Sequence, residues 1–253
     1  MFNKNKIILN HVRASNSKNI KANKLLERIA KDIIEREKFS DNTSYSILDL
    51  WSRTDNLYNF FKKKKTISYF STLCNFNIKT KNKKKIVSSI SPPFKENCFD
   101  YCFSIFSVGS SEDVINTFKR VHSILKTNGK FICVFPAEDS LKEFKMHFSK
   151  YFYKMDKKSF LPYIDIFSLG KIGRISGFKN IVIDKSAFYL KVNEPKEIWE
   201  FIRNIGESNT LQDHTVINIK KKEYMDFYHK LNVIIKNKNF KNTLSLNYFT
   251  GMK

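Results

Sequence analysis

The sequence predicts an α/β protein built on a doubly wound, mostly parallel β-sheet. The prediction rests on two short apolar runs, residues 101–108 (YCFSIFSV) and 130–135 (KFICVF), which lack strict polar alternation. Such runs are typical of strands that are buried on both faces of a parallel sheet. Between them, Val114, Phe118 and Val121 recur at helical spacing. A strand, a helix and a strand in this order predict parallel strands joined by a right-handed crossover.

The ends of that central helix are expected from its flanking residues. The serines of residues 109–111 are suited to cap its start, and Glu112 and Asp113 would lie in the first turn, where the helix dipole favours acids. Lys126 is expected to close the helix, and the pair Asn128-Gly129 to supply the left-handed residue that ends it. An Asn-Gly pair is also typical of a hairpin turn, but the helix before it favours a cap.

A family resemblance follows from residues 93–100 (PFKENCFD), the strand and helix after them, and residues 125–131 (LKTNGKF). Together they resemble the fourth and fifth strands of class I S-adenosylmethionine (SAM) methyltransferases. The chain further resembles the malonyl-carrier-protein methyltransferases of biotin synthesis and, more closely, the methyltransferase-like assembly factors of respiratory complex I and their bacterial relatives. The residues that carry this narrower resemblance are Asp139, Leu141, Glu143, Gly177-Phe178, residues 206–209 (GESN) and residues 248–251 (YFTG).

The resemblance covers nearly the whole chain and implies a Rossmann-like sheet of seven strands with a helical lid. The last strand, residues 244–250, would insert antiparallel between strands five and six. We expect one methyltransferase-like domain over residues 1–253. Its three parts are an N-terminal helical arm (1–40), a SAM-fold core (41–145), and the last strands with the lid (146–253).

The glycine-rich loop of the family is absent from this chain. Relatives follow the first strand with Asp-Leu-Gly-x-Gly-x-Gly, where glycine permits a tight turn and a close approach to the cofactor. Residues 49–55 read DLWSRTD, so Trp51, Arg53 and Asp55 stand in place of the three glycines. A tryptophan there would put an indole near the space that the cofactor fills in relatives.

Two acidic contacts to the cofactor are also replaced. Relatives end the second strand with an acid that binds the ribose hydroxyls, and here that place falls at Phe70-Ser71. The aspartate that contacts the adenine amine falls at Ser88. We therefore predict that SAM binds weakly or not at all. The residues that would border the cofactor are Asp49, Leu50, Trp51, Ser52, Ser71, Ser88 and Ser104.

No catalytic residue and no metal site is predicted. Gly109-Ser110 stands where relatives of this subgroup carry a His-Trp pair facing the substrate pocket. The four cysteines lack metal-ligand or disulfide spacing, and buried thiols are the expected state. The histidines at 122, 147, 214 and 229 have no carboxylate or nucleophile pattern nearby, so we interpret them as ordinary surface or core residues.

The net charge of +22, from 46 Lys and Arg against 24 Asp and Glu, raises the alternative of nucleic-acid binding. The abundance of Lys, Asn, Ile and Phe with only 7 Gly and 5 Pro is also typical of an AT-rich genome, and we attribute most of the charge to that bias. The runs 62–65 (KKKK) and 81–85 (KNKKK) are expected to form one basic patch at the edge where the strands begin. Residues 150–158 (KYFYKMDKK) combine bases and aromatics, as base-stacking segments do, although an aromatic stripe under a lid is more common.

Three functions remain open from the sequence. The first is a SAM-dependent methyltransferase with weakened or lost methyl transfer. The second is a non-catalytic or repurposed complex I assembly factor that binds a protein partner, such as a respiratory-complex subunit or a carrier protein. The third is a basic nucleic-acid-binding protein. Because no run is apolar and long enough to span a bilayer, and residues 1–6 lack the apolar core of a signal peptide, we expect a soluble cytoplasmic protein.

Overall fold

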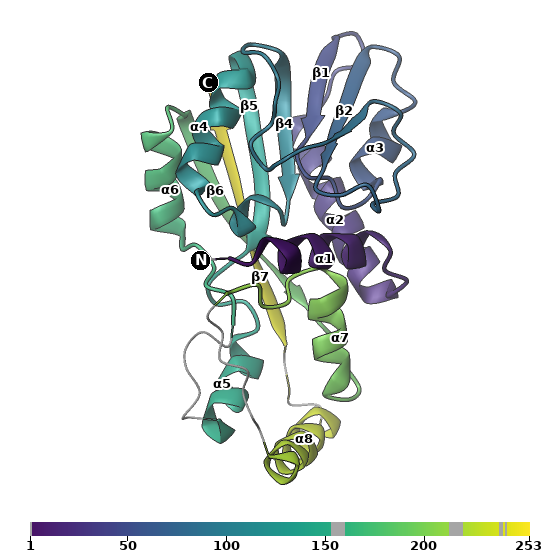
Figure 1. Ribbon diagram of the computed structural model, residues 1–253, viewed down its shortest axis with the longest axis vertical. Helices are drawn as coiled ribbons and strands as arrows, with labels where there is room; N and C mark the ends of the chain where they lie inside the picture. The colour runs from purple at the N-terminus through teal and green to yellow at the C-terminus, as the bar shows by residue number, and fades with distance from the viewer. Residues whose placement is uncertain (1, 153–159, 213–219, 238–239, 241) are drawn as a thin grey trace.

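One seven-stranded sheet organises the computed structural model, which describes residues 2–152, 160–212, 220–237, 240 and 242–253 (Figure 1). The strand order is β3-β2-β1-β4-β5-β7-β6. The strands β1 to β5 pair in parallel, and β7 pairs antiparallel with both β5 and β6. The strands are β1 (Tyr45–Asp49), β2 (Ile67–Leu73), β3 (Lys85–Val87), β4 (Phe99–Ile105), β5 (Leu125–Pro136), β6 (Lys179–Tyr189) and β7 (Thr243–Met252). The predicted fold class is confirmed.

The last strand lies where the sequence predicted it. β7 pairs along most of its length with β5, from Phe131 opposite Gly251 to Phe135 opposite Asn247. On its other side it pairs with β6, so it is inserted between the fifth and sixth strands. Seven of its ten residues are buried and the other three are half-buried, which fits a strand in the interior of a sheet.

Helices cover both faces of the sheet, as the alternation of side chains along β7 shows. The Tyr248 hydroxyl donates to Asp32 of α2 (Ile20–Glu37) at 3.1 Å. The next residue, Phe249, points to the opposite face, where its ring lies 5.1 Å from that of Phe118 in α4 (Val114–Ile124). α3 (Asn56–Phe61) packs beside α2, and α6 (Ile166–Ile175) beside α4. The sheet is therefore doubly wound.

The N-terminal arm, which the sequence predicted as helical over residues 1–40 without placing α1, contains two helices, α1 (Lys4–Ser15) and α2. The side chain of Asn3 caps α1 by accepting from the amide of Lys6 at 3.1 Å. In Figure 1, α1 crosses below the carboxyl end of β4, and it packs against α7 (Lys196–Asn204). α5 (Lys142–Tyr151) packs with α8 (Lys221–Lys236). The helices of the arm and of the lid region thus meet over the strand ends, while the division into three parts stays a prediction.

The predicted ends of α4 were wrong in detail. Asp113, and neither serine, caps the helix: its carboxylate accepts from the amide of Asn116 at 2.8 Å. The helix ends at Ile124 and β5 begins at once, since Leu125 already pairs with Phe99 of β4. Asn128 does adopt the left-handed conformation, with φ +64°, but inside the start of β5, where the register with β4 shifts.

The prediction of a single basic patch where the strands begin was also wrong in part. The run 62–65 follows α3 and precedes β2, as expected. β3, however, has only three residues and begins opposite Ser71, midway along β2. The segment before it reaches the other end of the sheet, because the amide of Lys81 donates at 2.9 Å to Asp55, which lies in the loop after β1. The two runs therefore do not share one edge.

No helix in the described ranges is both long and apolar enough to cross a membrane. The basic aromatic segment 150–158 and His214 lie largely or wholly outside the described residues, so the structure does not test the interpretations given to them.

Candidate functional site

Ligands of doubly wound sheets bind outside the carboxyl ends of the strands, where the strand order reverses. In this chain the reversal lies between β1 and β4, which are neighbours in the sheet. Three loops leave the carboxyl ends there, after β1, β3 and β4, and α1 lies across them. Two hollows border the loop after β1, one of about 440 Å³ and one of about 10 Å³.

The larger hollow, called here the Trp51 cavity, is built from the strand ends and from two helices. Trp51, Cys74 and Ser88 follow β1, β2 and β3, and line it from the sheet. Its remaining walls come from α1, the loop after β3, and the start of α4: Lys4, Ile7, Ile8, Val87, Ser89, Ile90, Ser91, Ser111, Glu112, Asp113, Asn116 and Thr117. A volume of this size lies in the range of small-molecule sites, about 300–1,000 Å³.

Trp51 is held in the wall of this cavity by three hydrogen bonds. Its backbone has φ +49°, a left-handed conformation that glycine adopts more readily than a bulky residue. The Trp51 amide donates to Thr72 Oγ1 at 2.8 Å, and the Ser107 hydroxyl donates to the Trp51 carbonyl at 3.0 Å. The indole Nε1 donates to the Ser88 carbonyl at 2.8 Å. The loop therefore keeps a left-handed turn at Trp51, and the indole lies beside Ser88, the residue predicted to border the adenine end of the cofactor.

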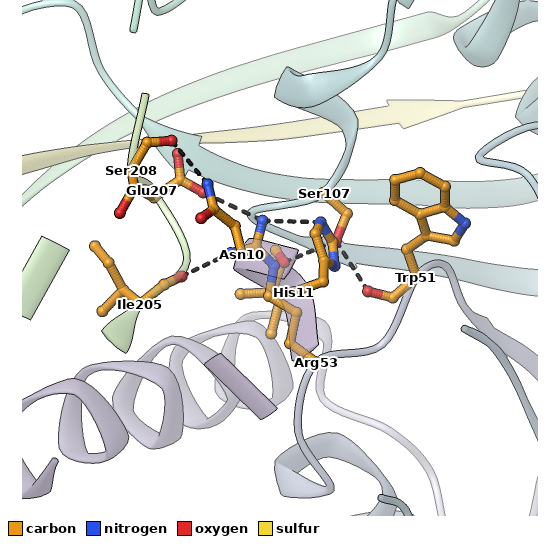
Figure 2. Close-up of polar contacts among 9 residues, drawn as sticks. Asn10, His11, Trp51, Arg53, Ser107, Ile205, Glu207 and Ser208 are labelled. Carbon is orange, nitrogen blue, oxygen red and sulfur yellow. Dashed lines mark hydrogen bonds and ion pairs between the residues drawn. The ribbon is translucent and has the colours of Figure 1, made fainter. Parts of the chain in front are cut away.

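Two residues further along the same loop, Arg53 fills the opposite side of the strand reversal. Its side chain is almost fully buried, and its guanidinium lies 5.9 Å from the ring centre of Phe106, just after β4. Figure 2 shows its polar contacts. Nη1 donates to the Ile205 carbonyl at 2.6 Å, and Nη2 lies 3.2 Å from both Glu207 Oε1 and His11 Nε2. Arg53 thus joins the loop after β1 to α1 and to the segment after α7.

The cluster around Arg53 is closed by backbone fit and by further hydrogen bonds. Gly206 has φ +77°, and a Cβ there would lie 2.5 Å from Arg53 Nη1, so only glycine permits this approach. Asn10 donates from Nδ2 to the Ser208 carbonyl at 2.8 Å. The Tyr163 hydroxyl also hydrogen-bonds to Glu207. These contacts tie α1 to the residues 206–208 in the absence of any ligand.

Burial governs the charges of this cluster. It lowers the pKa of His11 well below its usual value, and the positive charge of Arg53 lowers it further. His11 is therefore neutral, and its unprotonated Nε2 accepts from Arg53. Burial raises the pKa of Glu207 to about 7, against the opposing effect of the Arg53 guanidinium. The pair is stabilised by its mutual contact rather than by water.

The smaller hollow lies between Arg53 and the end of β1 and leaves almost no free space. Asp49, Ser52 and Arg53 line about 10 Å³, which is roughly the room for one water molecule. Asp49 is buried, accepts from the Tyr69 hydroxyl at 2.8 Å, and has its pKa raised to about 6 by burial. The side chains at this end thus do not fit a further organic group, whereas those of the Trp51 cavity leave room for one.

The sequence-predicted site residues separate into three groups. Trp51 and Ser88 line the Trp51 cavity, and Asp49 and Ser52 line the small hollow. Leu50, Ser71 and Ser104 are buried and line neither space: Leu50 belongs to the core, Ser71 lies inside β2 and Ser104 inside β4. Ser71 Oγ instead accepts from Asn82 at 2.9 Å.

The place assigned to the ribose acid needs a correction. β2 continues to Leu73, so its carboxyl end lies beyond Phe70-Ser71 and reaches Thr72 and Cys74. The Ser52 amide donates a hydrogen bond to the Thr72 carbonyl at 2.9 Å, so the end of β2 adjoins the loop after β1. None of them is acidic, so the absence of an acid at this strand end still holds.

Sequence reasoning missed most of the Arg53 cluster. His11 and Asn10 lie on α1, which was not predicted, although Ile7, His11 and Ala14 have the spacing of one buried helical face. Glu207 was noted only as part of the GESN motif. Its partner, Arg53, was noted only as a lost glycine, because a buried ion pair between residues 154 positions apart leaves no local pattern.

Comparisons with known proteins agree with this architecture. A family model described as "Methyltransferase domain" matches residues 66–133, about a quarter of the chain. The mitochondrial arginine-hydroxylase NDUFAF5 of Homo sapiens is 32% identical over 124 residues, which are 46% of this chain and 35% of that protein. The match thus spans only about a third of that relative's length.

Solved structures share the fold at low sequence identity. Phosphoethanolamine N-methyltransferase 2 of Haemonchus contortus, solved with SAM, has a TM-score of 0.52 and 15% identity, over 89% of this chain and 52% of that one. The [4+2]-cyclase SpnF has a TM-score of 0.51 and 11% identity, over 90% of this chain and 80% of that one. The strand order and these neighbours show that the chain has the fold of the SAM-dependent methyltransferases, and residues 66–133 match the methyltransferase-domain model.

Proposed function

We propose that this protein is a methyltransferase-fold protein with weakened or lost methyl transfer, which acts in the cytoplasm by binding a protein partner. The observation that carries the proposal is the buried Arg53, which stands in place of a loop glycine and fills the strand reversal with its own side chain. Fold alone does not decide the chemistry, since the structural neighbours include a protein named as a [4+2]-cyclase.

The Arg53 cluster opposes cofactor binding through the energy needed to open it. A ligand that extended from the Trp51 cavity to the end of β1 would have to displace the guanidinium from Glu207 and Ile205. Breaking a buried ion pair typically costs about 3–5 kcal/mol. Since about 1.4 kcal/mol is tenfold in affinity, this would weaken binding by roughly two to three and a half orders of magnitude.

A role as a binding protein needs no cofactor and agrees with the resemblance to complex I assembly factors. The relative NDUFAF5 is named as an arginine-hydroxylase, so methyl transfer is not the only activity attached to such sequences. A respiratory-complex subunit and a carrier protein are the partners that the resemblance favours. Nucleic-acid binding rests only on the net charge of +22 and stays the weaker alternative.

A thermal-shift comparison of SAM with adenosine tests the cofactor part of the proposal. A ligand at about 100 times its Kd stabilises a protein by roughly 2.7 kcal/mol. For a chain of this size, that raises Tm by about 5–10 °C, at about 2–4 °C per kcal/mol. We expect about a degree or less with millimolar SAM, and no larger effect than with adenosine, because the space beside Arg53 at the end of β1 is only about 10 Å³.

The same thermal-shift experiment tests the second candidate function, an active methyltransferase in which other residues have rebuilt the cofactor site. The observation in its favour is the 440 Å³ of the Trp51 cavity, which lies at the carboxyl ends of the strands. A shift of several degrees with SAM, and a smaller one with adenosine, would show that Arg53 and its neighbours accommodate the amino-acid end of the cofactor. The proposal of lost transfer would then be abandoned.

A further inference from the structure

A third hollow, called here the lid pocket, lies apart from the Trp51 cavity and has a different chemistry. It encloses about 220 Å³ between α5, α7 and the segments around residues 160–163 and 207–209. Five of its described lining residues are aromatic: Phe144, Phe148, Phe160, Tyr163 and Trp199. The others are Leu141, Lys145, Leu161, Ile202, Glu207, Ser208 and Asn209, so Lys145 is the single basic residue among them.

The aromatic walls of the lid pocket are fixed by contacts with one another. Phe144 meets Trp199 edge to face, with ring centres 4.9 Å apart, and Phe148 meets Phe160 in the same way at 5.3 Å. Such pairs are stabilising beyond the burial of their area. Because α5 and α7 hold these rings in place, the pocket is preformed for a flat or apolar group.

Lys145 brings a cation into this apolar pocket without a carboxylate to neutralise it. Its Nζ lies 5.7 Å from the ring centre of Phe160 and 5.3 Å from that of Tyr163. Its hydrogen-bond acceptor is the Glu138 carbonyl at 3.3 Å. Within the described part of the chain, no carboxylate oxygen lies within 4.0 Å of Nζ. Burial lowers the pKa of Lys145, as expected for an ammonium that lacks a close counter-ion.

The carboxylate of Glu207, which also lines the lid pocket, does not supply that counter-ion. Its Oε1 lies 3.2 Å from Arg53 Nη2, and the Tyr163 hydroxyl hydrogen-bonds to it. Asp139, whose charge raises the pKa of Lys145, is itself paired with Lys185 at 2.7 Å. The acids near the pocket are therefore committed to other partners, and the pocket keeps one positive charge.

We propose that the lid pocket binds a small molecule with an aromatic or alkyl body and one carboxylate, the body lying among the rings and the carboxylate at Lys145 Nζ. An apolar cavity of about 150 Å³ holds benzene, so 220 Å³ leaves room for a ring with a short acidic arm. A partly buried ammonium without a carboxylate partner gains from an anionic ligand, because charge-assisted hydrogen bonds are the strong ones. The proposal does not depend on whether SAM binds.

The two tryptophans of the chain allow a direct test, since Trp199 lines the lid pocket and Trp51 lines the other cavity. The full chain is titrated with 3-phenylpropionate, with its neutral amide and with 3-phenylpropylamine, while tryptophan fluorescence is followed. We expect the carboxylate to bind at least about tenfold more tightly than the amide, which corresponds to about 1.4 kcal/mol. The response should persist in Trp51→Phe and disappear in Trp199→Phe.

A matched pair of variants separates charge from fold. Lys145→Met keeps the apolar stem and should abolish the preference for the carboxylate while the amide still binds, which also shows that the variant is folded. Lys142→Met, an exposed lysine on the same helix, should leave the preference unchanged. Equal binding of carboxylate and amide in the natural chain, a preference for the amine, or a response carried by Trp51 would each overturn the proposal.

Discussion

The two sides of the strand reversal differ sharply although one short loop builds both. Around Trp51 the side chains leave about 440 Å³, and around Arg53 they leave about 10 Å³. The backbone of the loop still turns as a glycine loop does, with Trp51 at φ +49°. The difference arises from where the two side chains go: the indole lies along a wall and bonds to Ser88, whereas the guanidinium crosses to the residues after α7.

This comparison shows that a lost glycine has no single consequence. A bulky residue can replace glycine and leave a cavity open if neighbouring groups at the wall satisfy its polar atoms, as Thr72, Ser88 and Ser107 do for Trp51. Arg53 instead finds its partners, Ile205 and Glu207, across the space itself. The side of the strand reversal around Arg53, called here the closed side, is thus maintained by a buried ion pair. The side around Trp51, called here the open side, is maintained by hydrogen bonds at its rim.

Removal of Arg53 should have the largest effect on stability. Arg53→Ala leaves Glu207 buried without its cation, and loss of one partner of a buried pair costs about 3–5 kcal/mol. At about 2–4 °C per kcal/mol, Tm should fall by roughly 6–20 °C in a thermal melt. The control Lys63→Ala changes an exposed lysine and should stay within about 0.5 kcal/mol of the natural chain.

A double variant sharpens the same test. Arg53→Met with Glu207→Gln removes both charges together and should lose less stability than Arg53→Ala, since no unpaired charge is left behind. If Arg53→Ala melted at the same temperature as Lys63→Ala, the ion pair would not be what holds the closed side, and the barrier proposed against SAM would disappear with it.

The sheet was predictable because strand burial, helix spacing and the last strand each leave a local or familial pattern. The antiparallel insertion of residues 244–250 beside β5 followed from such patterns. The position of Ser88 at the cavity also followed, since it comes directly after a strand. The Arg53 cluster did not follow, because its strength lies in burial and in contacts between α1, the loop after β1 and residue 207. Cap residues such as Asp113 were misplaced because several neighbours have capping side chains.

The pH dependence of stability provides a second test of the closed side, through Asp49. Burial raises its pKa to about 6, above the value of about 3.9 expected in the unfolded chain. The folded state then binds the proton more tightly, so its stabilising effect is complete below about pH 4 and is lost as pH rises through 6. Asp49→Asn keeps an acceptor for Tyr69 and cannot ionise.

We expect the free energy of unfolding of Asp49→Asn, relative to the natural chain, to increase by about 2–3 kcal/mol between pH 4 and pH 7. Urea denaturation at a series of pH values measures this difference. Asp41→Asn, at an exposed carboxylate, is the control and should show a change of no more than about 0.5 kcal/mol. A difference for Asp49→Asn that did not vary with pH would mean that water reaches this carboxylate in the folded protein, and that the space beside Arg53 opens.

The smallest expected effect is a change in the affinity of the open side for adenosine when Ser88 is substituted. The family resemblance predicts that this residue stands where relatives carry the acid that contacts the adenine amine, and it lines the Trp51 cavity. Ser88→Asp would restore an acceptor for that amine without disturbing Trp51, because the indole bonds to the backbone carbonyl of Ser88. A hydrogen bond to a charged group contributes about 1.5–3 kcal/mol. Since Ser88 is only partly buried, we expect the lower end, about a tenfold gain in adenosine affinity.

Inosine is the matched ligand, because it has a carbonyl oxygen where adenosine has the amine and so offers no donor to the new carboxylate. Titration of both nucleosides against the fluorescence of Trp51 in the Trp199→Phe background should show a gain for adenosine alone. An equal gain for both would mean that Ser88→Asp acts on the shape of the cavity rather than through the amine. If neither nucleoside bound more tightly, the adenine base would not lie beside residue 88. The Trp51 cavity would then not correspond to the nucleoside site of the family, although its volume is preserved.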